Sequence, residues 1–337
     1  MTGTNKYYNC NGKPYLIEEY TKGYPISGKR YDPNGEVTSS YTLTNGSGVD
    51  EYYYYADKKQ VMGRIEYKGG VRNGPSLRFH NNGNKRFVGS YVNDKSHGKW
   101  EYYYHNGNKK RTAEYEYDTP VGQWEHYYQD GGIELRYQYS YGRLDGEYLS
   151  YHHNGKVAEK LTYLKGYLQG PTELYNYNGD LVVSYTYEND VLIGYASPDD
   201  NNKSKAMIPI SNGTAEIKAS YPNGQESVSY NITSGYINGE YLSHFPNGQL
   251  AVKLNYDNGK LHGEKLMYFD NGNSYMQENF SYGQYHGEQK YYHETGKLKR
   301  TENWLYGEQH GMTTIYDENE NVILTIRYIG DVPYDYN

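Results

Sequence analysis

The chain has 337 residues, a formal net charge of -7 and a sequence pI near 5.9. This charge excludes a broad basic surface for nucleic acid or for an anionic bilayer, and a single cysteine, Cys10, excludes an intramolecular disulfide. The chain contains 48 tyrosines but only 36% hydrophobic residues in all, so tyrosine rings must supply much of the apolar surface of any core.

The chain contains neither a run of about 18 apolar residues nor a charged segment followed by an apolar leader. We therefore expect no membrane span. Because the chain as given has no signal peptide, we expect a cytoplasmic protein; if a leader has been removed, the protein would instead be secreted.

Aromatic residues recur with a period of 24 residues along most of the chain. This first ladder consists of Tyr67, Tyr91, Tyr115, Tyr139, Tyr163 and Tyr187, and it resumes at Tyr256, Phe280, Trp304 and Tyr328. A glycine lies seven residues after a ladder aromatic, as at Gly74 and Gly98, and a second glycine lies nine residues further on, as at Gly83 and Gly107. A fixed period of this length indicates tandem structural repeats, about fourteen of them, that stack on their neighbours.

Each repeat reads as a pair of strands. In chain order, strands are predicted at 98–104, 113–117, 135–141 and 146–151, and in 135–141 every second residue is apolar or aromatic. Asn-Gly turns, which supply the positive φ of a tight hairpin, follow many of the strands. The predicted fold is all-β, an elongated twisted antiparallel sheet of about fourteen tandem 24-residue β-hairpins with almost no helix.

A second aromatic ladder lies four residues before the turn glycine. Its members are Tyr31, Tyr55, Phe79, Tyr103, Tyr127, Tyr151, Tyr175, Tyr268, Tyr292 and Tyr316. Because both ladders keep the repeat period, we expect their rings to stack between adjacent hairpins and to be structural.

The period is interrupted once. From Tyr187 to Tyr256 is 69 residues, three short of three periods, and the shortening falls between Gly194 and Ile208. We therefore predict one continuous array with N-terminal repeats over 1–194, a shortened irregular hairpin over 195–208 and C-terminal repeats over 209–337. The first two repeats, up to Asp50, and the last, ending at 331–334, deviate from the consensus and are expected to cap the ends.

Segments 94–100, 258–264 and 282–288, which read DKSHGKW, NGKLHGE and YGQYHGE, resemble MORN repeats. The resemblance covers nearly the whole chain, and the Asn-Gly turns bring it closer to the bacterial MORN variant of the YwqK antitoxin type than to the eukaryotic form. It implies a run of β-hairpins with a role in protein interaction or scaffolding, and some members of this variant are antitoxins. Two resemblances are only local: 31–38 is similar to a YD repeat of Rhs shell proteins, and 99–104 to an aromatic cell-wall-binding repeat.

Catalysis is not indicated by any pattern in the sequence. Four histidines, namely His97, His262, His286 and His310, share one repeat position before a glycine, which turn structure explains. Cys10 has no evident base beside it, and Asp199 and Asp200 lack the spacing of a calcium loop. Glu114 and Glu116 share one strand face rather than two different environments. We expect no enzyme activity, no metal and no cofactor.

One face of the predicted first strand varies between repeats, at two and four residues after the glycine. Its aromatic members in the N-terminal half are the candidate binding residues, namely Tyr52, Tyr54, Trp100, Tyr102, Trp124, His126 and Tyr148. Exposed tyrosine and tryptophan give a large contact area at small entropic cost. An alternative is that the sheet buries this face against itself.

The leading functional hypothesis is a non-enzymatic scaffold that binds another protein, a toxin or an assembly subunit. One alternative is an aromatic-lined carbohydrate or cell-surface binder, because planar rings stack on sugars. Another is a structural component of a larger assembly, such as a virion or appendage, in which edge strands pair chain to chain as homo-oligomers.

Overall fold

A computed structural model describes residues 2–10, 12–54 and 60–336, and the side-chain surroundings of residues up to 333. Within these ranges all regular structure is β-strand, which confirms the all-β prediction. No helix in the described chain is long and apolar enough to cross a membrane. Tyr55, predicted as a member of the second ladder, lies outside the described residues.

The chain divides into two compact units. The first comprises Met1–Val157 with Thr162–Tyr167, and the second Ala158–Leu161 with Leu168–Asn337. The strands of the first unit are β1 (Gly3–Tyr8), β2 (Pro14–Thr21), β3 (Tyr24–Tyr31), β4 (Val37–Thr42), β5 (Gly48–Tyr53), β6 (Val61–Lys68), β7 (Val71–Phe79), β8 (Lys85–Val92), β9 (Lys95–Ser96), β10 (Gly98–Tyr103), β11 (Lys109–Glu116), β12 (Thr119–Tyr127), β13 (Ile133–Ser140), β14 (Arg143–Leu144) and β15 (Gly146–Tyr151). The division between the units falls in β16 (Val157–Leu164) and β17 (Tyr167–Leu168).

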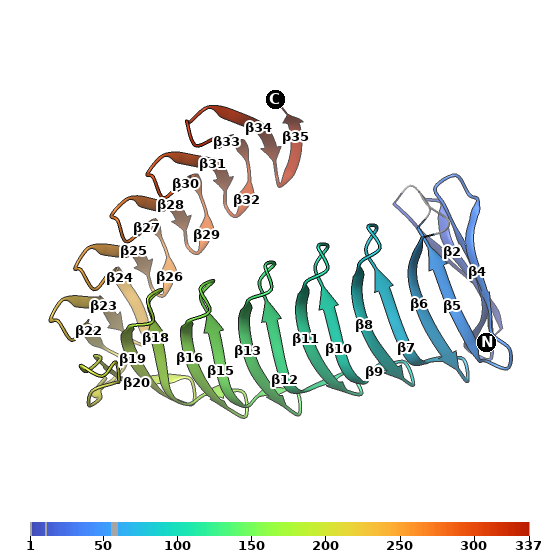
Figure 1. Cartoon of the computed structure of the whole chain (residues 1–337), viewed down its shortest axis with the longest axis horizontal. Coiled ribbons are helices and arrows are strands. Elements are labelled where there is room, and N and C mark those ends of the chain that lie inside the picture. The colour runs from blue at the N-terminus through green and yellow to red at the C-terminus, as the bar shows by residue number, and fades with distance from the viewer. Residues whose placement is uncertain (1, 11, 55–59, 337) are drawn as a thin grey trace. The chain divides into compact units, whose positions relative to one another are not determined.

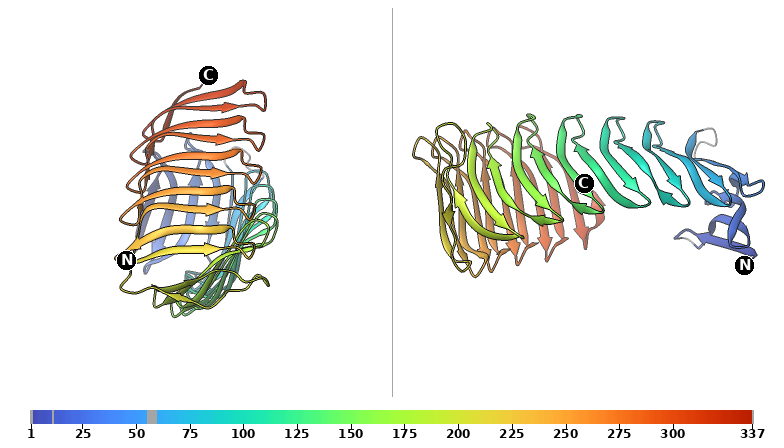
Figure 2. Two further views of the ribbon diagram at one scale, coloured as in Figure 1. Left: turned by 90° about the vertical axis from the view of Figure 1, so that its left-hand side faces the viewer. Right: turned by 90° about the horizontal axis from the view of Figure 1, so that it is seen from below.

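The second unit continues the same pattern. Its strands are β18 (Gly170–Tyr175), β19 (Leu181–Glu188), β20 (Val191–Ala196), β21 (Ile208–Pro209), β22 (Ala215–Ser220), β23 (Glu226–Thr233), β24 (Tyr236–His244), β25 (Leu250–Asp257), β26 (Lys260–Leu261), β27 (Gly263–Tyr268), β28 (Ser274–Ser281), β29 (Gln284–Tyr285), β30 (Gly287–Tyr292), β31 (Leu298–Leu305), β32 (Glu308–Gln309), β33 (Gly311–Tyr316), β34 (Val322–Ile329) and β35 (Val332–Tyr336). Strands β22 to β35 form one antiparallel sheet, and Figure 2 shows its successive hairpins in yellow to red.

The hairpins have the predicted register. In the first unit, Figure 1 shows β5 to β15 as successive hairpins side by side. The repeat glycine pairs with the first-ladder aromatic of the next strand, as in Gly98↔Tyr115 of β10 and β11 and Gly122↔Tyr139 of β12 and β13. A register shift follows at the second-ladder residue, as between Tyr102 and Tyr103. Each repeat therefore ends in the same β-bulge.

Two kinds of turn alternate along the array. The two-residue turns, such as Asn93–Asp94 and Tyr117–Asp118, have positive φ at both positions, which is the type I′ geometry that matches strand twist. At the longer Asn-Gly turns that follow a second-ladder residue only the glycine has positive φ, as at Gly107 (φ 94°), whereas in a two-residue turn such as Asn258–Gly259 both residues have it. The asparagine of these longer turns therefore does not supply a positive φ, although the Asn-Gly pattern predicted that it would, and it must have another role.

The purpose of the turn asparagine is a bond between repeats. Asn106 Oδ1 accepts a hydrogen bond from the Asn108 backbone N–H (3.0 Å), while Asn106 Nδ2 donates to Gln129 O in the next turn (2.9 Å). Asn271 makes the equivalent pair of bonds, within its own turn and to Glu294 O. One side chain thus fixes its own turn and holds the next one.

The two faces of the hairpins differ. We call the face that carries Trp100, Ala113 and Trp124 the core face, and the face that carries Glu101, Thr112 and Glu125 the outer face; register pairs place these residues together. On the core face, first-ladder tyrosines meet tryptophans edge to face, with centroids 5.1 Å apart for Tyr91–Trp100 and 5.2 Å apart for Tyr115–Trp124. Such pairs contribute about 0.5–1.5 kcal/mol each beyond burial. The rings of this ladder are structural, as expected, but their partners here are tryptophans at another repeat position rather than the next ring of the same ladder.

The second unit has a core of a different composition. Where the sheet that contains β19 gives way to the one that begins at β22, strand β19 packs against β22 and β23. Val183, Ile217 and Val228 are fully buried there, and the Ser227 hydroxyl donates to Val182 O (2.6 Å). Two sheets packed together exclude water from aliphatic side chains, which a single sheet does less completely.

Candidate interaction surfaces

The predicted binding row lies largely on the core face. Trp100 is only 4% exposed and Trp124 only 6%, so the expectation that they stand exposed for a partner is wrong. Tyr102, His126 and Tyr148 are half-buried. The two tryptophans instead fit the alternative given above, in which the sheet buries this face with its own side chains.

Neighbouring rings and a missing side chain explain the burial of Trp100. Phe87, Tyr91 and Tyr102 pack around it. On the adjacent strand stands Gly89, where an added Cβ would lie 2.1 Å from the Trp100 ring. Because this glycine has no side chain, the indole can lie flat against the backbone of its neighbour.

The N-terminal members of the row are out of register with the prediction. Gly48, not residue 50, pairs with Tyr67, so the two core-face positions of this repeat are Asp50 and Tyr52. Tyr54 therefore does not belong to the row; its hydroxyl donates to Phe79 O at the next turn (2.7 Å), as Tyr104 does to Tyr127 O. Tyr53 occupies the bulge position that was predicted for Tyr55.

A buried ion pair that the sequence reading missed lies in the same repeat. Both guanidinium nitrogens Nη1 and Nη2 of Arg30 bind the Asp50 carboxylate at 2.6 Å, and Asp50 is 1% exposed. The pair links β3 to β5, and Tyr52 stacks on the guanidinium at 4.3 Å. The spacing from Gly48 to Tyr67 is 19 residues, against 17 from Gly98 to Tyr115, and this difference is the signal that could have revealed Asp50 as a core residue.

The outer face carries a row of hydrogen-bonded glutamate and tyrosine pairs. Each second-ladder tyrosine of this row donates its hydroxyl to the glutamate two residues before it. In the first unit the pairs are Tyr53–Glu51 (2.6 Å), Tyr103–Glu101 (2.8 Å) and Tyr127–Glu125 (2.5 Å). In the second unit, Tyr175 donates to Glu173 in the same way (2.9 Å). Because the tyrosine and the carboxylate hold each other in one rotamer, the side chains of this row are ordered before any partner binds.

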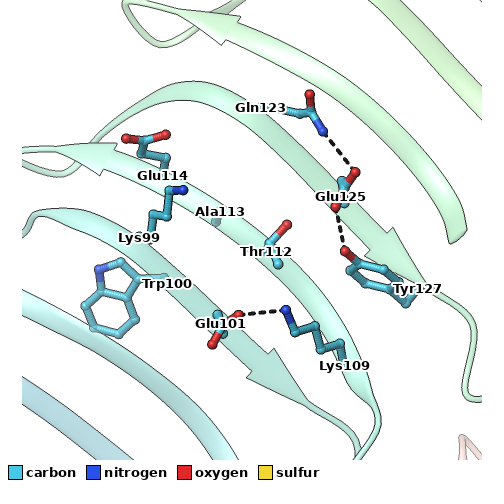
Figure 3. Close-up of a pocket in the computed structure, with 10 residues that line it drawn as sticks. All are labelled: Lys99, Trp100, Glu101, Lys109, Thr112, Ala113, Glu114, Gln123, Glu125 and Tyr127. Atoms are coloured by element: carbon cyan, nitrogen blue, oxygen red, sulfur yellow. Dashed lines mark hydrogen bonds and ion pairs between the residues drawn. The ribbon is translucent and has the colours of Figure 1, made fainter. Parts of the chain in front are cut away.

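A depression of about 430 Å³ on the outer face is lined by Glu101 of one pair and by both Glu125 and Tyr127 of another (Figure 3). Figure 3 shows Glu101 bonded to Lys109, and Glu125 bonded to both Gln123 and Tyr127. Lys99 and Glu114 line it as well, so two lysines and three glutamates surround it. This arrangement is a polar recess with fixed donors and acceptors rather than an apolar pocket.

Two carboxylates of this recess, Glu101 and Glu125, are held in the charged form. Hydrogen bonds from Lys109 and Tyr103 lower the pKa of Glu101. Burial opposes the charge of Glu125, but bonds from Tyr127 and Arg136 lower its pKa below the ordinary value. In turn, burial and the bond to Glu101 raise the pKa of Tyr103 to about 12. At neutral pH the row therefore presents carboxylates and neutral phenols.

The recurrent histidines His97 and His286 occupy equivalent positions in their repeats and make the same kinds of contact. The backbone N–H of His97 donates to Ser90 O, and that of His286 to Asn279 O. Their rings contact the next two-residue turn, with 4.7 Å from His97 to Tyr117 and 4.7 Å from His286 to Tyr306. Within the described ranges, no group of three or more His, Cys, Asp or Glu side chains is placed to hold a metal ion.

The structure also places Cys10 and Asp199, two other residues that the sequence analysis considered for chemistry. Cys10 is exposed. Asp199 Oδ1 accepts the backbone N–H groups of Asn201 and Lys203 at 2.9 Å, so it shapes its own turn.

Comparison with known proteins identifies the repeat. The MORN repeat variant matches residues 96–117, 144–165, 237–258 and 285–305. Each matched segment holds a repeat glycine and the first-ladder aromatic that pairs with it, such as Gly98 with Tyr115 and Gly287 with Trp304. No curated protein matches the chain.

Solved structures with some likeness include the Photorhabdus luminescens Tc holotoxin pore with the mutation TccC3-D651A (11% identity, 98% of this chain, 19% of that chain, TM-score 0.16) and TcdB2-TccC3 (11%, 97%, 23%, 0.14). This chain spans about a fifth of their length, and TM-scores this low do not define a shared fold. The four matched segments, 87 of the 337 residues, are similar to the MORN repeat variant.

Proposed function

We propose that the protein is a non-catalytic scaffold that binds another protein through its outer face. The observation that carries the proposal is the row of Glu–Tyr pairs at Glu51, Glu101 and Glu125 in the first unit, which repeats one ordered acidic and aromatic arrangement. Ordered side chains lose little entropy on binding, and tyrosines are favoured at interfaces. A toxin is one class of partner, suggested by the resemblance to antitoxins of the MORN variant.

The outer face suits this role better than the tryptophan row. Trp100 and Trp124 are already covered by Phe87, Tyr115 and their other neighbours. A partner could reach them only by displacing that packing. Their replacement by alanine would therefore remove core volume, at a cost of about 3–5 kcal/mol, and would not report on binding.

The test is a pull-down from the source organism's lysate with the immobilised full chain, with retained proteins identified by mass spectrometry. The outer-face variant is Glu101→Lys/Glu125→Lys. The matched control, Glu294→Lys/Glu318→Lys, makes the same charge change at exposed turn residues of other repeats. We expect one stoichiometric protein that the wild type and the control retain and the outer-face variant loses.

The proposal is wrong if no protein is retained, or if the outer-face variant retains the same protein as fully as the control does. Circular dichroism of each variant verifies that the sheet is folded. Cross-links between the retained protein and Lys99 or Lys109 would place the contact, because both lysines line the recess.

A further inference from the structure

A second depression, of about 530 Å³, lies near the turns at the end of the core face in the first unit. Its lining includes Arg86, Lys110, Arg111, His80, His126 and Tyr102, and no described aspartate or glutamate lines it. Three permanent positive charges therefore converge in a chain whose net charge is -7. A local charge opposite in sign to that of the whole molecule attracts ligands that the rest of the surface repels.

Arg111 is held in place by aromatic rings rather than by an acid. Its guanidinium carbon lies 4.1 Å from the Tyr102 ring centroid and 5.5 Å from that of Trp124. Its Nε is buried and has no hydrogen-bond partner in the described chain. Stacking fixes the plane of a guanidinium while its edges remain able to donate to a carboxylate in a fork.

The other two cations are also without a carboxylate partner. Arg86 is exposed and makes no ion pair with any described residue, and Lys110 lies over the Tyr104 ring at 5.5 Å. On the outer face of the same hairpins, by contrast, Lys109 pairs with Glu101 and Arg136 with Glu125. Two outer-face cations of these hairpins are thus paired with carboxylates, whereas the three cations of this depression are not paired with any described carboxylate.

The positive charges of the depression also affect the protonation of its histidine, His126. Burial, followed by the positive charges of Arg111 and Lys110, lowers the pKa of His126. Its Nε2 lies 2.8 Å from the Tyr137 hydroxyl. His126 is therefore neutral at pH 7, and the positive charge of the depression comes from the two arginines and the lysine.

We propose that this depression binds the carboxylate side chains of an acidic peptide segment of a partner protein. Its volume suits a few side chains rather than a long polymer. An extended polyanion such as nucleic acid needs a row of basic residues, and the acidic chain provides no such row. Because Tyr102, Arg111 and His126 belong to the core face, the site is separate from the outer-face recess, and either proposal can fail alone.

The test is fluorescence anisotropy of a labelled glutamate hexapeptide at low ionic strength, with the full chain. The pocket variant is Arg86→Gln/Lys110→Gln, since both residues are exposed and their replacement leaves the ring packing intact. The matched control is Lys68→Gln/Lys95→Gln, which removes the same charge at exposed residues of the first unit that line neither depression. We expect the pocket variant to weaken binding about tenfold or more and the control less than about twofold, since a close charge-assisted bond exceeds a screened distant one.

A third variant, Arg111→Lys, keeps the charge but loses the planar fork, and we expect it to weaken binding by about fivefold. The proposal is overturned if the hexapeptide does not bind, if pocket and control variants weaken it equally, or if a lysine hexapeptide binds as well. Inorganic phosphate that displaces the peptide at lower concentration than free glutamate would also overturn it, because the site would then be selective for phosphate rather than for a carboxylate.

Discussion

At the scale of the single residue, glycines meet two different physical needs. Gly98 has a φ of 74° and open space around its missing Cβ, so its backbone conformation requires glycine. Gly89 has no such φ, but the Trp100 ring occupies the space of its side chain. The first need recurs at repeat glycines such as Gly74, Gly122 and Gly146, which also have positive φ, whereas the second belongs only to a repeat with a large ring opposite.

We predict that Gly89→Ala destabilises the protein by about 1–3 kcal/mol, because the new methyl group would overlap the Trp100 ring. The matched control is Gly132→Ala, where the nearest atoms to an added Cβ lie at 3.5 and 3.7 Å. The control should change the free energy of unfolding by less than about 0.5 kcal/mol. Urea unfolding followed by tryptophan fluorescence measures both. Equal effects of the two substitutions would show that Trp100 is not packed as described.

At the scale of the element, the Asn-Gly turn couples one hairpin to the next. Asn106 uses its carbonyl oxygen within the turn and its amide nitrogen between turns. A short loop joined to its neighbour in this way resists fraying, because opening one turn breaks bonds in two repeats.

Two substitutions separate the two bonds of Asn106. We predict that Asn106→Asp keeps the bond to the Asn108 N–H but loses the donation to Gln129 O, with a loss of about 1 kcal/mol in stability. Asn106→Ala loses both bonds and should cost about 2 kcal/mol. Thermal unfolding ranks the variants. If aspartate and alanine are equally destabilising, the bond within the turn contributes nothing.

The sequence predicted the elements well, because their period and turns are local. The pairing of Gly98 with Tyr115 follows from the 24-residue spacing, and the irregular spacing near Gly48 is what displaced the prediction at Tyr54. Alternation shows which residues share a face of a strand, as Trp100 and Tyr102 do, but not which face neighbouring side chains will cover. That depends on contacts such as Gly89 with Trp100, which join residues on different strands. The Arg86–Arg111 depression was missed for the same reason.

At the scale of the whole molecule, tyrosine replaces the usual aliphatic core in many repeats. Burial is the main cause that raises the pKa of Tyr115 and Tyr137 to about 12 in the first unit, and that of Tyr221 and Tyr241 to about 12 in the second. These phenols are neutral and packed at neutral pH. A core made in this way depends on the protonation of its own side chains.

We therefore predict that stability falls steeply in alkali. Because the folded pKa of these phenols lies above the unfolded value near 10, their contribution is complete below pH 10 and is lost as the pH rises from 10 towards 12. Tyrosinate absorbance, measured with circular dichroism, should show the native chain ionising many of its tyrosines later than the chain in guanidinium, and together with loss of the sheet. Tyr115→Phe keeps the ring without the ionisable hydroxyl and should move the alkaline midpoint upward. A native titration that overlays the denatured one would mean that the tyrosine rings are accessible to water, and that this core does not exclude it.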